Sequence, residues 1–281
     1  MKAKTSLILT LKVILALSLI LGVFSTCSRK SHILNPSGQT SPFLFKLNFV
    51  ETCLLDLIQD VHLIVSSNGD TLADKHLELQ NRAISDTIEV QAGADWKFTL
   101  QALDASNNII YSGDTTVSVI AGETTNLQIN LYPEVFLLKF DPIYQEVVND
   151  SVFNVEVRLY NVDSLFSTSF RVEFDSSVLF CTDVESGDFL GSSSTIFFSV
   201  IDTVKGYVAV GYSLKQGNGS GVSGSGTLAR LHFKIRKQAG ESPNLADLIF
   251  NEETLAFYDP YGERKDWKDS LYIHNAQVLI E

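Results

Sequence analysis

Apolar and polar residues alternate along almost the whole of this chain, and this pattern limits the fold more than any other feature. In "KFTLQALDA", residues 97–105, Phe98, Leu100 and Ala102 share one face and the residues between them share the other. A repeat of two residues is typical of β-strands with one buried face. Turns rich in Gly, Asn and Asp separate the alternating segments. The sequence therefore predicts an all-β fold of short strands, as in sandwiches and barrels.

The β-rich part of the chain is long enough for two domains of ordinary size, since it spans about 240 residues. Pro133 ends the alternating segment "LQINLYP" and marks the seam between them. We expect one β-sandwich at 43–133 and a second at 134–281. The first resembles the immunoglobulin-like and carboxypeptidase-regulatory-like modules that follow lipoprotein anchors, which implies that it acts as a spacer.

Residues 1–26 have the composition of an export signal. Lysines come before a short apolar run, residues 13–24, which is too short to span a membrane comfortably. Small residues then lead to Cys27, so the segment resembles a bacterial lipoprotein signal in which this cysteine is lipidated. The residues just before Cys27 depart from the usual lipoprotein pattern, which leaves plain secretion as the alternative. Residues 27–42 are rich in Ser, Pro, Gly and Asn, which predicts a flexible tether.

The chain is therefore expected to be exported and lipid-anchored in the bacterial cell envelope, at the outer membrane or cell surface. Its formal net charge is −12, and this becomes −15 without residues 1–26, which hold three lysines and no acid. Such a charge disfavours nucleic acid and anionic lipid head groups as partners. Cys53 and Cys181 lie in different predicted domains, and their number excludes a disulfide framework. The histidines are scattered singly, so neither a metal site nor a cofactor is expected.

The glycine-rich stretch "GNGSGVSGSG", residues 217–226, contains the G-x-G-x-x-G spacing of dinucleotide-binding loops. That motif works only between a strand and the N-terminus of a helix. Here residues 206–214 predict a strand before it, and residues 227–237 alternate with a period of two, which predicts another strand after it. We therefore expect a loop between two strands and no bound nucleotide.

Four segments of the second domain together resemble the cohesin family. They are "VRLYNVDSLFSTSFRVEFDSSVL" (157–179), "VESGDFLG" (184–191), "GSGTLARLHFKIR" (224–236) and "FYDPYGERKDW" (257–267). The resemblance implies a nine-stranded jelly-roll sandwich with no catalytic activity. It also implies a partner, because cohesins bind dockerins, small calcium-loaded helical modules fused to enzymes, and so gather enzymes on a scaffold or cell surface. Any calcium would then belong to the partner.

The resemblance places the partner-binding surface on one sheet of the sandwich. Alternation along residues 195–202 favours Ile196, Phe198 and Val200 as the core side. Where cohesins place an asparagine and an aspartate, this chain has Ser167 and Ser169. The residues expected on the binding face are Ser167, Ser169, Arg171, Phe197, Ala209, Gly211, Ser213, Tyr258 and Tyr261.

Two other functions remain open. Carbohydrate-binding modules share the jelly-roll architecture, and a strip of exposed aromatic rings could stack on a polysaccharide. A purely structural envelope protein is the other alternative. An enzyme is not expected, because the sequence has no G-x-S-x-G elbow, H-E-x-x-H helix or Ser/His/Asp cluster. The aromatic residues considered for the strip are Tyr207, Tyr258, Tyr261 and Trp267.

Overall fold

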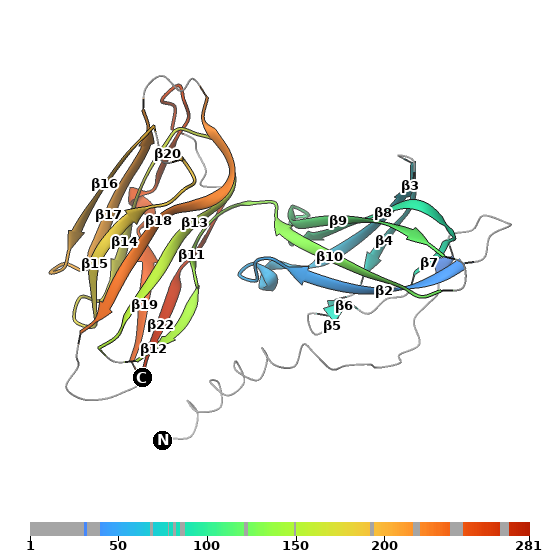
Figure 1. Ribbon diagram of the computed structural model, residues 1–281, viewed down its shortest axis with the longest axis horizontal. Helices are drawn as coiled ribbons and strands as arrows, with labels where there is room; N and C mark the ends of the chain where they lie inside the picture. The colour runs from blue at the N-terminus through green and yellow to red at the C-terminus, as the bar shows by residue number, and fades with distance from the viewer. Residues whose placement is uncertain are drawn as a thin grey trace.

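A computed structural model shows two β-rich domains (Figure 1). The structure does not describe the predicted export signal, Cys27 or most of the tether expected at 27–42. Trp267 also lies outside the described residues. Within the described part, no helix is long and apolar enough to cross a membrane. The described residues are 31–32, 40–67, 70–77, 79–80, 83–84, 88–120, 123–148, 150–191, 194–215, 220–236, 244–264 and 270–281.

The first domain is one hydrogen-bonded path of eight strands in the order β1-β7-β2-β10-β9-β8-β3-β4. β2 and β10 pair in parallel, and so do β1 and β7, whereas the remaining pairs along the path are antiparallel. A small hairpin of β5 and β6 lies apart from this path. The elements are β1 Ser31–His32, β2 Thr40–Phe49, η2 Leu55–Leu57, β3 Asp60–Ser67, β4 Asp70–Leu77, β5 Leu79–Gln80, β6 Ala83–Ile84, β7 Ile88–Gln91, β8 Gly93–Leu103, β9 Ile109–Val119 and β10 Thr125–Pro133.

The core of the first domain follows the predicted alternation. Phe98, Leu100 and Ala102 of β8 are fully buried, as expected from their spacing. The same period buries Leu127 and Ile129 on β10. Because successive strand residues point to opposite faces, these apolar positions bring β8 and β10 onto one shared core.

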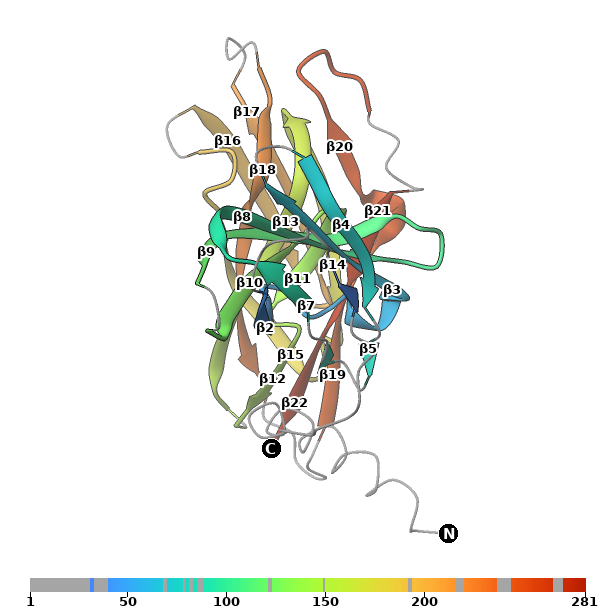
Figure 2. The ribbon, with the colours of Figure 1, turned by 90° about the vertical axis from the view of Figure 1, so that its right-hand side faces the viewer.

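The second domain is a sandwich of two sheets (Figure 2). One sheet has the order β15-β18-β13-β11-β21; the other has the order β12-β22-β19-β14-β17-β16, with β20 paired to β14. Nine of its described strands have five residues or more, and β12, β20 and β21 are shorter. The all-β prediction, with a sandwich in the second half, is confirmed. The elements are β11 Phe136–Asp141, β12 Tyr144–Val147, β13 Val152–Leu165, β14 Ser167–Phe174, β15 Leu179–Ser186, β16 Thr195–Asp202, β17 Tyr207–Leu214, β18 Val222–Ile235, β19 Asn244–Phe250, η3 Glu252–Thr254, β20 Ala256–Tyr258, β21 Leu271–His274 and β22 Ala276–Ile280.

Aromatic side chains fill the space between the two sheets of the second domain. Phe140 stacks on Phe250 across the sandwich with ring centroids 4.1 Å apart. Phe153 and Phe233 stack at 5.5 Å, and Phe174 meets Phe233 edge-on at 5.3 Å. Phe153 and Phe233 belong to one sheet, whereas the other two pairs cross between the sheets and so help to fix how the sheets lie on each other.

The two domains meet at a partly polar contact. Glu51 of the first domain accepts hydrogen bonds from Lys139 and Tyr160 of the second. The side chains of Lys139 and Glu51 are 5% and 11% exposed, so removing Lys139 would leave the Glu51 charge buried without its counter-ion. Tyr272 donates a hydrogen bond to Asp104 across the same seam at 3.2 Å. The first domain therefore packs directly against the second.

Both described cysteines are free thiols. Cys181 is buried in the core of the second domain, and Cys53 is half-buried against the core of the first. Burial raises the pKa of Cys53 to about 11 and that of Cys181 to about 12. Both thiols therefore stay protonated at neutral pH and lack the thiolate that reacts.

A strand follows the glycine-rich stretch, as predicted, but it begins earlier than the expected residue 227. β17 ends at Leu214, and β18 begins at Val222 within the stretch itself. Residues 216–219 lie outside the described part of the chain. Because a strand rather than a helix follows, the helix N-terminus that a dinucleotide phosphate requires is missing at this position.

Candidate docking face

Three neighbouring strands, β14, β17 and β16, turn one side away from the core of the second domain. β17 is antiparallel to both neighbours, and the register aligns Ser169, Gly211 and Phe198 in one row across them. β16 ends the sheet, on the side of the second domain that lies far from the first domain (Figure 1). We call this surface the outer face. Its residues are Ser167, Ser169 and Arg171 of β14, Ala209, Gly211 and Ser213 of β17, and Ile196, Phe198 and Val200 of β16.

β14 and β17 orient as the sequence predicts. Phe170 and Val172 are buried on β14, and Val208, Val210 and Tyr212 are buried on β17. The residues between them turn outward, and most of these are partly exposed. Large apolar residues alternate here with small or polar ones, so burial of the large set decides which side faces the core. The partly exposed residues of the predicted face are Ser167, Ser169, Arg171, Ala209 and Ser213.

The prediction for β16 is wrong, because this strand faces the opposite way. Phe197 points inward, where its ring meets that of Tyr212 edge-on with centroids 5.4 Å apart. Ile196, Phe198 and Val200, expected in the core, are 53%, 63% and 53% exposed. Both sides of β16 carry apolar residues, so alternation could not distinguish inside from outside. Phe197 therefore leaves the predicted face, and three apolar residues take its place.

Gly211 also differs from the prediction, because it is covered rather than open. A Cβ atom at Gly211 would lie 2.3 Å from the Phe198 ring. Because Gly211 has no side chain, the ring can approach the backbone of β17 closely. Glycines within strands often mark such a close approach. The apolar centre of the outer face is therefore the Phe198 ring, which rests on Gly211.

Arg171 forms the polar end of the outer face. Its guanidinium lies 4.0 Å from the ring centroid of Tyr207, a cation–π contact, and 3.1 Å from a carboxylate oxygen of Glu173. Asn251 donates a hydrogen bond to the same carboxylate at 2.8 Å. These contacts hold the Arg171 side chain in one position and cover one side of the Tyr207 ring.

The two tyrosines expected as aromatic anchors lie in different settings. Tyr258 is partly buried on β20 and pairs with Ser167 at the margin of the outer face. Tyr261 is 89% exposed on the following turn. The Asp259 carboxylate holds this turn by accepting backbone N–H bonds from Tyr261 and Glu263, both at 2.9 Å. Tyr258 thus extends the face, whereas Tyr261 stands clear of the described protein surface.

Hydrogen bonds behind and beside the outer face fix β17 and its turn. The Tyr212 hydroxyl donates to the carbonyl oxygens of Gly187 and Gly191, at 2.9 and 3.0 Å, and burial raises the pKa of Tyr212. In the turn between β16 and β17, Asp202 accepts backbone N–H bonds from Lys205 at 2.9 Å and Val204 at 3.1 Å, which lowers the pKa of Asp202. The outer face therefore rests on a hydrogen-bonded frame.

A comparison with protein families identifies the second domain. Residues 145–266 match the family model described as the cohesin domain. The chain contains a cohesin domain. The match covers less than half of the 281 residues and leaves the first domain outside it. Cohesin domains are non-catalytic modules that dock other proteins.

Solved cohesin structures are similar to about half of the chain. The third cohesin of ScaC from Acetivibrio cellulolyticus, solved with the ScaB dockerin, is 16% identical, covers 52% of this chain and 98% of its own, and has a TM-score of 0.45. A type I cohesin–dockerin complex from Clostridium thermocellum gives 17% identity, 52% and 92% coverage and a TM-score of 0.43. A non-cellulosomal cohesin from Archaeoglobus fulgidus is 20% identical, covers 52% of this chain and 90% of its own, and has a TM-score of 0.40. The search of curated proteins found no match.

Outside the cohesin domain, the structure brings together a polar group that the sequence analysis missed. Asp60, His62 and His76 each offer one ligand atom, and these atoms all lie within 4.8 Å of one another. The spacing of Asp60 and His62 was a usable signal, since residues two apart in a strand share a face. The sequence did not show which other strand would bring His76 beside them.

Proposed function

We propose that the cohesin domain binds a dockerin-type protein module through the outer face and so tethers enzymes at the cell surface. The observation that carries this proposal is the cohesin family match over residues 145–266. Ile196, Phe198 and Val200 of β16 form an exposed apolar row in the same domain, which supplies a surface for the contact. Calcium in such a complex belongs to the dockerin, as it does in the family that the sequence resembles.

The chemistry of the outer face suits a protein partner. A stable interface buries about 800 Å² on each partner, with an apolar centre and a polar rim. Ile196, Phe198 and Val200 supply the centre, and Ser169 and Arg171 supply hydrogen-bond donors beside it. Aromatic and arginine side chains most often dominate binding energy. We therefore assign the largest contributions to Phe198 and Arg171.

Polysaccharide binding is less well supported by the described residues. Tyr207 has the Arg171 guanidinium over its ring, and Tyr258 is partly buried at a strand margin. Sugar platforms need exposed rings that lie in one plane. Retention on insoluble polysaccharide should nevertheless be measured beside dockerin binding, because carbohydrate-binding modules have a similar architecture.

Binding should be measured by calorimetry between the full chain and a panel of recombinant dockerin modules from the same organism, with calcium and with a chelator. Val200→Glu places a charge in the apolar row and should weaken binding about tenfold or more. Val152→Glu is the matched control, because Val152 is 73% exposed on the opposite sheet of the same domain. Both variants should keep the wild-type circular dichroism spectrum.

Equal weakening by both variants would contradict the outer face as the docking site. Failure of every dockerin, together with retention on insoluble polysaccharide, would replace docking with glycan binding. Failure in both arms would leave the structural envelope role.

We further propose that Cys27 carries a lipid and anchors the chain in the cell envelope, with the first domain as a spacer. The support is the signal-like composition of residues 1–26. Mass spectrometry of the mature N-terminal peptide should find an acylated Cys27, and Cys27→Ala should move the protein into the soluble fraction. An unmodified N-terminal peptide would favour plain secretion instead.

A further inference from the structure

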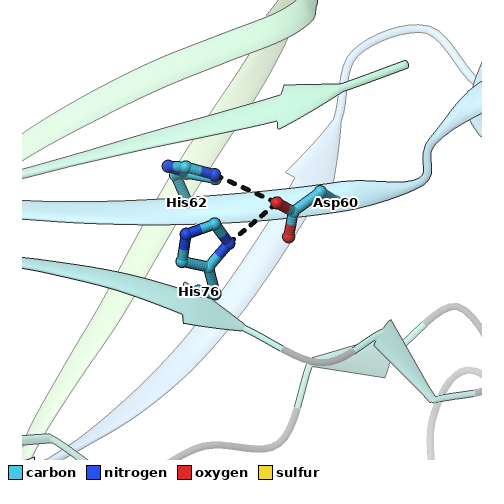
Figure 3. A group of neighbouring side chains, drawn as sticks. All are labelled: Asp60, His62 and His76. Carbon is cyan, nitrogen blue, oxygen red and sulfur yellow. Dashed lines mark hydrogen bonds and ion pairs between the residues drawn. The ribbon is translucent and has the colours of Figure 1, made fainter. Parts of the chain in front are cut away.

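Two histidines and an aspartate meet on the edge hairpin of the first domain, far from the outer face in the sequence and in the fold. β4 is the last strand of its sheet and pairs only with β3 in the described path. His62 of β3 and His76 of β4 are direct cross-strand partners, and Asp60 lies two residues before His62 on the same side of β3. Figure 3 shows the three side chains converging, with both imidazoles directed at the Asp60 carboxylate.

The distances between these donor atoms are close to those in a transition-metal site. One Asp60 oxygen, Oδ2, lies 3.0 Å from His62 Nε2 and 2.8 Å from His76 Nδ1. Zinc binds nitrogen and oxygen ligands at about 2.0–2.1 Å, so neighbouring ligand atoms around a tetrahedral ion are about 3.3 Å apart. The three ligand atoms all lie within 4.8 Å of one another, so an ion can enter between them if Asp60 Oδ2 moves a few tenths of an ångström away from the two nitrogens.

Neighbouring groups already hold two of the three side chains in position. The backbone N–H of Val61 donates to the other Asp60 oxygen, Oδ1, at 2.8 Å, which leaves Oδ2 directed at the imidazoles. On the far side of the His62 ring, Nδ1 lies 3.5 Å from an Asp74 carboxylate oxygen. A carboxylate behind a metal-binding histidine is the usual device that fixes the ring and strengthens it as a ligand.

We propose that Asp60, His62 and His76 bind a divalent transition-metal ion, with zinc as the principal candidate. Two imidazoles and one carboxylate suit zinc, copper or nickel rather than calcium or magnesium, which prefer oxygen ligands alone. His76 is 69% exposed and His62 is 22% exposed, so the ion would reach the site from solvent and keep water as its remaining ligand. The ion would link the edge strand β4 to β3 and so stabilise the end of the first domain's sheet that these two strands form.

The test is a zinc titration of the full chain, purified in detergent without an affinity tag, in competition with a chromophoric chelator. Wild type should bind one zinc per chain. His76→Ala should lose at least about tenfold in affinity, and Asp74→Asn about tenfold, as for other groups behind metal ligands. His274→Ala is the control, because it removes a partly exposed histidine of the second domain.

Cobalt gives an independent readout, since wild type should show the visible absorption of a tetrahedral ion and His76→Ala should not. Zinc should also raise the unfolding temperature of wild type but not of His76→Ala, because only a bound ion stabilises the folded state. Without zinc, the two proteins should unfold alike, which separates metal loss from misfolding. Equal zinc affinity in wild type and His76→Ala, or a loss of the same size in His274→Ala, would overturn the proposal.

Discussion

β16 and β17 are neighbours in one sheet, yet only β17 has an orientation that its sequence determines. On β17, large residues such as Val210 and Tyr212 alternate with small ones such as Gly211, and the large set is buried. On β16, apolar residues stand on both sides, and the side that holds Phe198 is exposed. The orientation of β16 therefore comes from its register with β17 and not from its own pattern.

This difference leaves an exposed apolar side on a strand at the end of the sheet. A strand in the middle of a sandwich sheet has one apolar side, because solvent covers the other. β16 keeps a second apolar side, and its exposed row would need a partner to leave water. A short apolar run without clear alternation, at the end of a sheet, is therefore a place where an exposed apolar row can form.

The strongest test of the comparison is Tyr212→Ala on β17. Truncating a buried aromatic ring costs about 3–5 kcal/mol of unfolding free energy, and this change also removes the hydrogen bonds to Gly187 and Gly191. Urea unfolding of the full chain, followed by circular dichroism, should show this loss of unfolding free energy in the transition of the second domain. A cost below about 1 kcal/mol would mean that β17 is not a core strand.

The next test uses the two adjacent phenylalanines of β16. Phe197→Ala should cost about 2 kcal/mol, because its ring is partly buried against Tyr212. Phe198→Ala should change stability by no more than about 0.5 kcal/mol, because its side chain is mostly exposed. The two variants are matched controls for each other, and the same urea unfolding measures both. The reverse order of costs would restore the orientation expected from the sequence.

Much of the fold could be predicted because alternation is strong wherever one side of a strand is buried. Phe98 and Leu100 on β8, and Phe170 and Val172 on β14, occupy the faces that their spacing indicates. The strand after the glycine-rich stretch followed from the same rule. Pairing between distant strands was not readable, because hydrogen bonds between backbones carry no residue code.

The candidate sites show the same limit. The orientations of β14 and β17 were predicted, whereas Phe197 on β16 and Gly211 on β17 were given the wrong exposure. Phe198 covers Gly211 only because β16 and β17 pair in one particular register. His62 and His76 likewise meet through strand pairing, although 14 positions separate them in the sequence. Contacts made by register, rather than by spacing along one strand, were therefore the ones that sequence reasoning missed.

Gly211→Ala should give the smallest change in stability and tests how the two strands fit together. Its new methyl group would displace the Phe198 ring, which can swing into solvent because it is 63% exposed. Replacing a strand glycine with alanine also gains roughly 0.5–1 kcal/mol of backbone entropy, so the net change should stay near zero.

The displaced ring has its own signature in NMR spectra. In wild type, the ring of Phe198 should shift the α-proton resonances of Gly211 upfield, and Phe198→Ala should abolish this shift. In Gly211→Ala, the contacts between the ring and β17 should weaken in the same way while the contacts between Phe197 and Tyr212 persist. Wild-type contacts at both rings in Gly211→Ala would show that Phe198 does not depend on the glycine. The exposed row of β16 would then be an independent feature of the edge strand rather than one that β17 positions.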